Sequence, residues 1–281
     1  MSRAQDLATL AWLVEMGADE AIAAEPIDRL SPTATAPATA APAIATGAGA
    51  PARTARIAAV AAIPTTSSPP PIPAAPTAAP EAAASAQALA AAATSLGELE
   101  AAIRGFDGCS LKATATNTVF SDGVPGARVM FVGEAPGADE DRLGRPFVGV
   151  SGQLLDRMVA CIGLDRATSF YIANVIYWRP PGNRTPTTAE VAICLPFIRR
   201  QIELAAPEIL VFLGASAAHA LLGTTGAIGR LRGRWLDYAT PGLTRPVQAL
   251  ATFHPAYLLR SPGQKRESWR DLLMIKNKLT G

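Results

Sequence analysis

Residues 128–149 read RVMFVGEAPGADEDRLGRPFVG, and this stretch decides the fold. Its apolar start, 128–132, predicts a buried strand that ends in a turn rich in glycine and proline. A second apolar run, 247–251, precedes the segment FHPAYLL at 253–259. Ligands of open α/β sheets bind at the carboxyl ends of parallel strands, so we expect the two segments to meet at one site.

Two further apolar runs, 170–175 and 209–213, predict the remaining central strands. Helical patterns lie between and around the four runs, at 99–106, 151–162, 188–205, 216–222 and 265–278. Short apolar strands separated by helices indicate an α/β fold whose parallel sheet is covered on both faces. We therefore predict a central sheet of four parallel strands.

The composition divides the chain into three parts. Residues 1–30 carry a net charge of −4 and predict a short acidic amphipathic helix. Residues 31–94 are mainly Ala, Pro, Thr and Ser, which bury too little apolar surface to offset the entropy of ordering. We predict a disordered linker there, transiently helical at its end. Residues 95–281 carry a net charge of +5 and are long enough for one well-buried domain.

The sequence does not support several functional classes. It contains no apolar run of transmembrane length, and no basic segment followed by an apolar core marks a secretory signal. The two His and three Cys lack the spacing of a zinc site, and no Ser or Cys lies in a nucleophile motif. Three scattered Cys do not form a disulfide framework, so we expect a reducing, cytoplasmic compartment.

Four residues at or near the predicted strand-end loops are the candidate catalytic and substrate-binding groups. Glu134 lies in the GEAPG turn, which also has the composition of a plain strand exit. Phe147 lies between glycine-containing turns, where a ring either covers the core or stacks on a flat heterocycle. Asn174 either caps a turn or hydrogen-bonds the edge of a base. His254 follows the last strand, whereas His219 lies in an apolar helical context typical of a structural histidine.

Two groups of cationic side chains lie near these loops. Arg179 and Arg184 belong to the proline-rich loop WRPPGNRTP, whose stiffness and charge suit the binding of phosphates. Arg260, Lys265 and Arg266 follow the FHPAYLL segment and predict a surface for a nucleic-acid backbone. The positive charge of the predicted domain is compatible with such a polyanionic partner.

Taken together, these motifs resemble the family-4 uracil-DNA glycosylases, the bacterial and archaeal branch of the uracil-DNA glycosylase superfamily. The resemblance covers residues 106–279 and rests on the ordered motifs GEAPG, GRPFVG, SGQLLDRM, RPPGNRTP and HPAYLLR. It implies a three-layer α/β/α sandwich. It also implies hydrolysis of the N-glycosidic bond of deoxyuridine in DNA, which releases uracil and leaves an abasic site in base excision repair. Such an enzyme flips the base out of the stack.

The resemblance implies catalytic roles for three residues. His254 donates a hydrogen bond to uracil O2 and stabilises the departing uracil anion. Glu134 positions the attacking water and faces the developing sugar cation. Asn183 corresponds to a second asparagine that the family uses near the active site, and Glu140 supports the motif loop.

Substrate binding is implied for a second set of residues. Phe147 stacks on the extruded uracil, Asn174 reads its Watson–Crick edge, and the backbone amide at Ala135 helps to hold the ring. Leu258 or Leu259 wedges into the vacated stack, a role known for apolar side chains at kinked base steps.

The chain departs from the family at its cofactor site. Members hold a 4Fe–4S cluster on four cysteines. Cys109 and Cys194 occupy two of the corresponding positions, whereas Phe106 and Trp178 occupy the other two. Two thiols are too few ligands, so we expect no cofactor and no metal. We hypothesise that the two aromatic side chains fill the volume of the cluster, because an empty cavity would be costly.

Two functions of different classes follow from these observations. The first is a metal-independent uracil-DNA glycosylase that acts as a monomer on uracil-containing DNA of the bacterial nucleoid. The second is a catalytically inactive relative that binds uracil or DNA. Retention of Glu134, Phe147, Asn174 and His254 favours the enzyme. The helix predicted at 1–30 is expected to dock on its own domain or to recruit a protein partner.

Overall fold

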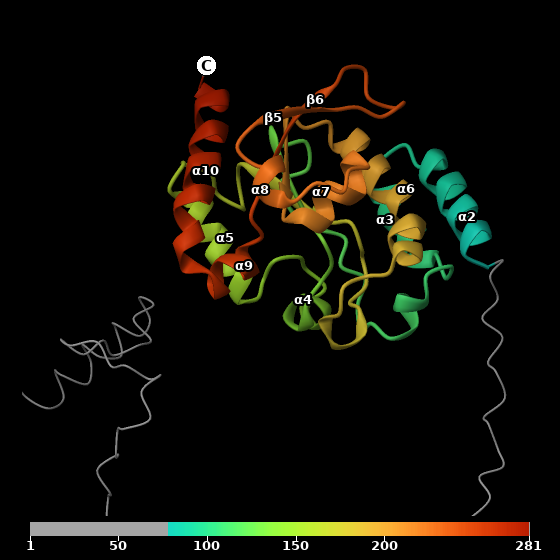
Figure 1. The fold of residues 1–281 in the computed structure, drawn as a ribbon. Helices are drawn as coiled ribbons and strands as arrows, with labels where there is room; N and C mark the ends of the chain where they lie inside the picture. Colours follow the sequence, from blue (N-terminus) through green and yellow to red (C-terminus); the bar gives the residue numbers. More distant parts are fainter. Residues whose placement is uncertain (1–77, 281) are drawn as a thin grey trace, which may run out of the picture. The chain divides into compact units, whose positions relative to one another are not determined.

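The computed structural model describes residues 78–280, which are built on one mixed sheet (Figure 1). The helix predicted at 1–30 and most of the predicted linker lie outside the described residues. The sheet has six strands in the order β1-β3-β2-β4-β6-β5. Their bounds are Ser121–Gly123 (β1), Val129–Gly133 (β2), Phe170–Asn174 (β3), Ile209–Leu213 (β4), Trp235–Tyr238 (β5) and Val247–Thr252 (β6).

The centre of the sheet agrees with the prediction, but its edges do not. β3, β2, β4 and β6 are parallel and correspond to the four predicted apolar runs. The prediction that the sheet has four strands is wrong, because β1 pairs antiparallel with β3 and β5 pairs antiparallel with β6. β1 is the short sequence SDG, and β5 is only partly buried, so neither forms the apolar run that marks a buried strand.

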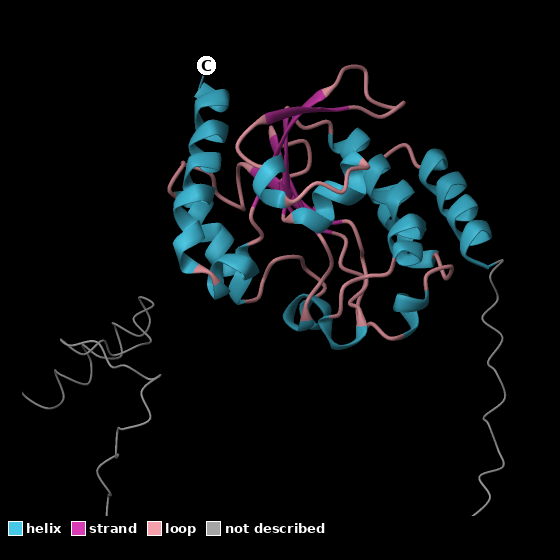
Figure 2. Cartoon of the chain, in the orientation of Figure 1, coloured by secondary structure: helices cyan, strands magenta, loops and turns pink. Residues whose placement is uncertain are grey.

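Helices cover both faces of the sheet, as predicted (Figure 2). On one face, α5 (Val150–Ala160) and α10 (Lys265–Thr280) pack on the side chains at alternate strand positions, such as Phe131 and Ile172. The opposite face carries Met130 and Phe212 and is covered by α6 (Thr188–Ala205) and α7 (Ala215–Leu222), while α2 (Ala78–Ala92) and α3 (Leu96–Gly105) pack against α6. Successive residues of a strand point to opposite faces, so fully apolar strands require both helical layers. The three-layer α/β/α arrangement is therefore confirmed.

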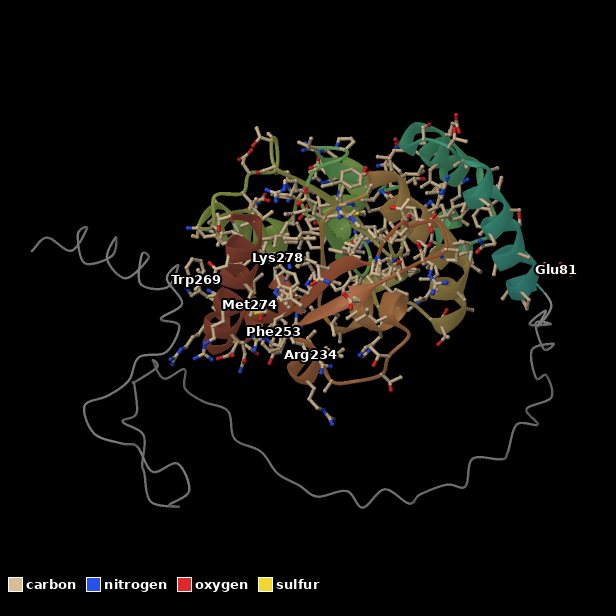
Figure 3. All side chains as sticks on the ribbon, turned by 90° about the horizontal axis from the view of Figure 1, so that it is seen from above. Glu81, Arg234, Phe253, Trp269, Met274 and Lys278 are labelled. Carbon is tan, nitrogen blue, oxygen red and sulfur yellow. The ribbon has the colours of Figure 1, made fainter. Side chains whose placement is uncertain are left out.

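The predicted helices are present, with boundaries displaced by a few residues in most cases. They are α3 (Leu96–Gly105), α5, α6 (Thr188–Ala205), α7 (Ala215–Leu222) and α10. On α10, Met274 packs against the core, whereas Trp269 is exposed and points away from the sheet (Figure 3). The remaining helical turns are α4 (Ala138–Leu143), α8 (Ile228–Leu231), α9 (Pro255–Arg260), η1 (Ser110–Ala113), η2 (Pro181–Asn183) and η3 (Pro262–Gln264). Within residues 78–280, no helix combines the length and apolarity that crossing a membrane requires.

The boundary between linker and domain lies earlier than predicted. Residues 78–92 form the regular helix α2, which packs against α6. Ala86 and Ala90 are fully or almost fully buried, and the carbonyl of Ala93 accepts two hydrogen bonds from Arg200 at 3.0 and 2.9 Å. Alanine has the highest helix propensity, and its small side chain lets two helices approach closely. The end of the predicted linker is therefore part of the folded domain.

Candidate active site

The carboxyl ends of the parallel strands meet at one edge of the sheet and form a cavity. Gly133 pairs with Asn174 at the end of β2 and β3, and Leu213 pairs with Thr252 two residues before His254. The cavity has a volume of about 450 Å³. It brings together eight of the predicted site residues: Glu134, Ala135, Phe147, Asn174, Asn183, Arg184, His254 and Arg260.

The floor of the cavity depends on the absence of a side chain at Gly133. A β-carbon there would overlap both the Phe147 ring and the Asn174 Oδ1 atom. On its other side, the Phe147 ring lies 5.7 Å from the His254 ring, with 32° between the ring planes. Glycine therefore lets an aromatic ring and a strand-end amide meet at the bottom of the cavity.

Asn174 presents an unused hydrogen-bond acceptor. Asn174 is only 2% exposed, and its Oδ1 atom has no hydrogen-bond partner among the described residues. Buried polar atoms without partners are costly and rare in folded proteins. An orphaned acceptor that lines a cavity therefore points to a ligand that supplies the missing donor.

His254 is held as a neutral ring with a defined tautomer. It is the N-cap of α9, and its Nδ1 atom accepts a hydrogen bond from the Ala256 amide at 3.1 Å. A neutral imidazole carries one proton, so Nε2 is the N–H donor. Burial and the charge of Arg260 lower the pKa of His254 from 6.5 to about 4. At neutral pH the ring is therefore an uncharged donor.

Glu134 is the acidic group of the cavity. It directly follows β2, and its Oε1 atom is buried without a hydrogen-bond partner among the described residues. Burial raises the pKa of this carboxyl above its usual value, and a hydrogen bond involving Ser216 only partly offsets that effect. Glu134 also borders a second cavity of about 440 Å³ that Ser216 and His219 line. A carboxylate with a raised pKa can accept a proton from water.

Glu140 braces the loop that carries Phe147, as the resemblance implied. One of its carboxylate oxygens accepts hydrogen bonds from the amides of Val148 and Gly149 at 3.0 and 2.9 Å. The other oxygen accepts one from the amide of Gly137 at 3.1 Å. A single side chain therefore links the GEAPG turn to the GRPFVG segment.

The His219 ring has a structural contact, as expected. One of its nitrogens lies 2.6 Å from the backbone carbonyl of Gly226. This contact joins α7 to the loop that precedes α8. His254 is therefore the histidine of the first cavity.

The predicted DNA-binding arginines of the proline-rich loop are both engaged within the protein. Arg179 Nε donates to Asn183 Oδ1 at 2.6 Å, which holds Asn183 in a left-handed conformation with φ of 55°. Arg184 makes a two-pronged ion pair with Glu190 at 2.6 and 2.9 Å. Both interactions stiffen this wall of the cavity. That these two residues bind phosphates stays a prediction.

The second predicted cationic group lies beside and beyond the cavity. Arg260 lines its rim, at the end of α9. Lys265 and Arg266 are exposed at the start of α10. That these three residues contact a nucleic-acid backbone stays a prediction.

The prediction that Leu258 contacts DNA is wrong. Leu258 is fully buried and packs against Leu154 and Phe253. Leu259, by contrast, is 41% exposed, and Tyr257 is 37% exposed. Residues 255–260 form α9, so neighbouring side chains point in different directions around the helix. The sequence alone did not fix the rotation of this short helix.

Sequence reasoning also missed residues that shape the cavity. Tyr257 and Ser151 line it and belong to motifs that the resemblance already included, so their motif membership was an available signal. Arg166 binds the backbone of the Phe147 loop from a segment without any motif. No pattern in a single sequence marks such a residue.

The four positions that the resemblance assigns to a 4Fe–4S cluster are filled by two buried free thiols and two buried rings. Cys109 and Cys194 are unpaired, and Trp178 Nε1 donates to Thr118 Oγ1 at 3.1 Å. The Phe106 ring packs edge-on against Phe197 at 5.2 Å. Residues 78–280 contain no group of three or more His, Cys, Asp or Glu side chains placed to hold a metal ion. The residues present do not fit a cluster, which needs four thiolates.

Comparisons with known proteins agree with the geometry of this edge. The sequence profile described as the uracil DNA glycosylase superfamily matches residues 120–273, which include both cavity-forming segments. The chain belongs to this superfamily. Type-4 uracil-DNA glycosylases from Pyrobaculum aerophilum and Archaeoglobus fulgidus are each 39% identical to it, over 184 and 185 residues. Each alignment covers 64% of this chain and 92% of the relative.

A third relative supports the same branch. The type-4 uracil-DNA glycosylase of Thermotoga maritima is 42% identical over 154 residues, which cover 54% of this chain and 77% of that protein. The family-4 assignment made from the motifs is confirmed. The uracil-DNA glycosylase fold of this chain therefore carries its candidate site at the strand ends where the superfamily profile matches.

Proposed function

We propose that this protein is a uracil-DNA glycosylase that hydrolyses the N-glycosidic bond of deoxyuridine in DNA. The observation that carries the proposal is the buried, unpartnered Asn174 oxygen beside the Phe147 ring and the neutral His254. An acceptor, a stacking surface and an uncharged donor together match a flat heterocycle that carries both an N–H group and carbonyl oxygens. Uracil is such a base, and the type-4 relatives are named for it.

Recognition follows from hydrogen-bond polarity. Asn174 Oδ1 accepts the N3–H proton of uracil, and the amide nitrogen donates to O4. Cytosine presents an acceptor and an amino group at these positions, so it would leave two buried groups unsatisfied. The site therefore favours uracil over cytosine, and base flipping brings the base into the cavity.

The chemical step separates charge along the bond that breaks. The C1′–N1 electron pair leaves with uracil, and the Nε2–H group of His254 donates to O2 of the resulting anion. The Glu134 carboxylate faces the developing positive charge on the sugar, accepts a proton from water and directs the water oxygen to C1′. A hydroxyl replaces the base, the uracil anion later takes a proton from solvent, and an abasic site remains.

The surroundings of the site complete the proposal. Arg260, Lys265 and Arg266 contact phosphates of the DNA that enters the cavity. Leu259 takes the wedge role in place of the buried Leu258. The protein acts as a monomer on chromosomal DNA in the cytoplasm.

The proposal is tested with a uracil-containing oligonucleotide in EDTA, followed by alkaline cleavage of abasic sites. Wild-type protein is expected to give strand scission. Glu134→Gln and His254→Asn are each expected to lower the rate about 100-fold or more while binding is retained, because each removes one group that acts in the transition state. Asparagine at position 254 keeps an N-cap acceptor for α9.

Glu208→Gln is the matched control for the acidic variant. Glu208 is half-exposed, pairs with Arg128 and lies at the opposite ends of the strands. Its replacement is expected to leave the rate unchanged. Wild-type protein that binds uracil-containing DNA and never cleaves it would overturn the proposal in favour of the inactive relative.

We also propose that catalysis proceeds without a 4Fe–4S cluster. The support is the packing of Trp178 and Phe106 at two of the four ligand positions, where the indole N–H is already satisfied by Thr118. Cys109 and Cys194 then act as small buried apolar side chains. No step of the reaction depends on them.

Iron and acid-labile sulfide in anaerobically purified protein test this second proposal. Neither is expected in stoichiometric amount, and strand scission in EDTA is expected from the same batch. Phe106→Cys with Trp178→Cys restores four thiols and is expected to gain iron on reconstitution, whereas wild type is not. Four irons per chain in the native protein would overturn it.

A further inference from the structure

Phe147 is held in a backbone conformation that it would not adopt unaided. Its φ of 55° lies in the left-handed region, which a residue with a β-carbon rarely enters. Phe147 is nevertheless only 5% exposed and lines the active-site cavity. Something in the surrounding structure must therefore fix this backbone.

Arg166 supplies that restraint from outside the motifs. Its guanidinium donates to the carbonyl oxygens of Pro146 at 2.9 Å and Phe147 at 2.8 Å. The remaining N–H groups donate to Asp122 at 3.0 Å and to Asp156 at 3.0 and 2.9 Å. All five donors of the side chain are thereby used. Arg166 joins the Phe147 loop to β1 and α5 at once.

The restraint is two-sided. Glu140 holds the amides that follow Phe147, and Arg166 holds the carbonyls at and before it. Gly152 completes the arrangement, because a β-carbon there would overlap the Phe147 carbonyl. The loop is therefore held in one conformation before any base enters.

The charge of Arg166 is neutralised by neighbouring carboxylates, so Arg166 has a structural role and is not a contact for DNA phosphates. Its side chain is 15% exposed and lies between the carboxylates of Asp122 and Asp156. Burial alone would raise the pKa of Asp122, but hydrogen bonds from Arg145 and Arg166 outweigh it and lower that pKa. The planar fork is needed, because a lysine cannot reach two carbonyls and two carboxylates together.

We infer that Arg166 is a positioning residue for base recognition, acting through the backbone of Phe147. The inference rests on the proposed function, because it concerns the ring on which uracil stacks. Arg166 fixes the plane of that ring before DNA binds, so the site does not have to order it during binding. Loss of Arg166 should weaken the hold on uracil more than it slows the chemical step.

The test compares Arg166→Lys and Arg166→Met with wild type in the oligonucleotide assay. The inhibition constant for free uracil is expected to rise about tenfold, and KM is expected to rise with a smaller change in kcat, because stacking geometry is lost while Glu134 and His254 stay. Asp156→Ala removes one partner of Arg166 and is expected to shift the uracil inhibition constant in the same direction. The Asp156 variant replaces the Arg166 variants in this test if those do not fold.

Arg200→Lys is the matched control. Arg200 also donates twice to a backbone carbonyl, that of Ala93, and once to a carboxylate, that of Glu203, but it lies between α6 and α2. It is expected to lower the midpoint of thermal unfolding without changing uracil inhibition. An equal shift in uracil inhibition from Arg200→Lys would mean that any loss of stability has this effect, and would overturn the inference.

A double-mutant cycle separates positioning from a general structural role. In a Phe147→Ala background, Arg166→Met is expected to cause no further loss of uracil affinity, since the ring it places is absent. Full additivity would overturn the inference, as would unchanged uracil inhibition in an active Arg166→Met. Absence of uracil release by wild type is the distinct result that overturns the proposed function itself.

Discussion

At the scale of single residues, the proposed recognition of uracil depends on groups that stay uncharged or unpaired. His254 is neutral at pH 7, and the Asn174 Oδ1 atom has no hydrogen-bond donor among the described residues. Both states result from burial at strand ends, which raises the cost of charge and of missing hydrogen bonds. The burial of His254 has a measurable consequence for the pH dependence of stability.

The low pKa of His254 predicts how stability responds to acid. The pKa is 6.5 in the unfolded chain and about 4 in the folded one, so only the unfolded state takes up this proton between those values. Stability is therefore unaffected by His254 above pH 6.5 and falls as the pH drops toward 4, by about 3 kcal/mol in total. Chemical denaturation at a series of pH values measures it.

His254→Asn provides the reference for that measurement, because it keeps an N-cap acceptor and does not titrate. The free energy of unfolding of wild type relative to this variant is expected to decline between pH 6.5 and pH 4. Parallel curves for the two proteins across this interval would contradict the low pKa.

At the scale of elements, the sequence predicted the helices and strands whose formation depends on local patterns of residues. The four central strands are apolar runs, and α6 begins where Pro186, Thr187 and Glu190 form a start signal with a capping box. β1 and β5 were not predicted, and α2 was predicted only as a transient helix, because the stability of all three comes from tertiary partners and not from an apolar run or an amphipathic stripe. Eight of the cavity residues were predicted from motifs, and Ser151 and Tyr257 were missed although they lie in those motifs, whereas Arg166 acts through contacts that no pattern encodes.

The rotation of α9 predicts opposite outcomes for two adjacent leucines. Leu258→Ala removes a fully buried side chain and is expected to cost about 2–5 kcal/mol of stability. Leu259→Ala is expected to change stability by less than about 0.5 kcal/mol, because that side chain is 41% exposed.

Cleavage assays separate the same pair. Leu259→Ala is expected to lower cleavage of uracil in duplex DNA more than in single strands, because only the duplex has a stack for the side chain to fill. Thermal unfolding together with both cleavage assays measures the two effects. Equal loss on both substrates would remove the wedge role from Leu259.

At the scale of the whole molecule, charge is distributed unevenly. The predicted N-terminal helix is acidic, and residues 95–281 carry a net charge of +5. Several arginines of that domain are neutralised by carboxylates, including Arg128, Arg184 and Arg232. The ion pairs of the described residues do not include Arg260, Lys265 or Arg266, and Arg260 lines the cavity.

We expect Arg260, Lys265 and Arg266 each to contribute to the salt dependence of DNA binding. Alanine at Arg260, Lys265 or Arg266 should reduce the slope of log affinity against log salt by about 1 each, because each phosphate contact releases condensed counterions. Arg128→Ala, at the opposite ends of the strands, is the control and should leave the slope unchanged. Fluorescence anisotropy over a salt series measures it, and identical slopes for all four variants would contradict this assignment.

The short antiparallel strands at the two edges of the sheet have a consequence for the protein at high concentration. An edge strand is a template on which another chain can add by backbone pairing, and long flat edges invite aggregation. β1 is only three residues long, its Asp122 is tied into ion pairs, and β5 carries the charged Asp237 beside Trp235. A foreign strand would find few consecutive hydrogen-bonding groups at either edge. The sheet of this domain is therefore protected against growth by strand addition when many copies are crowded together.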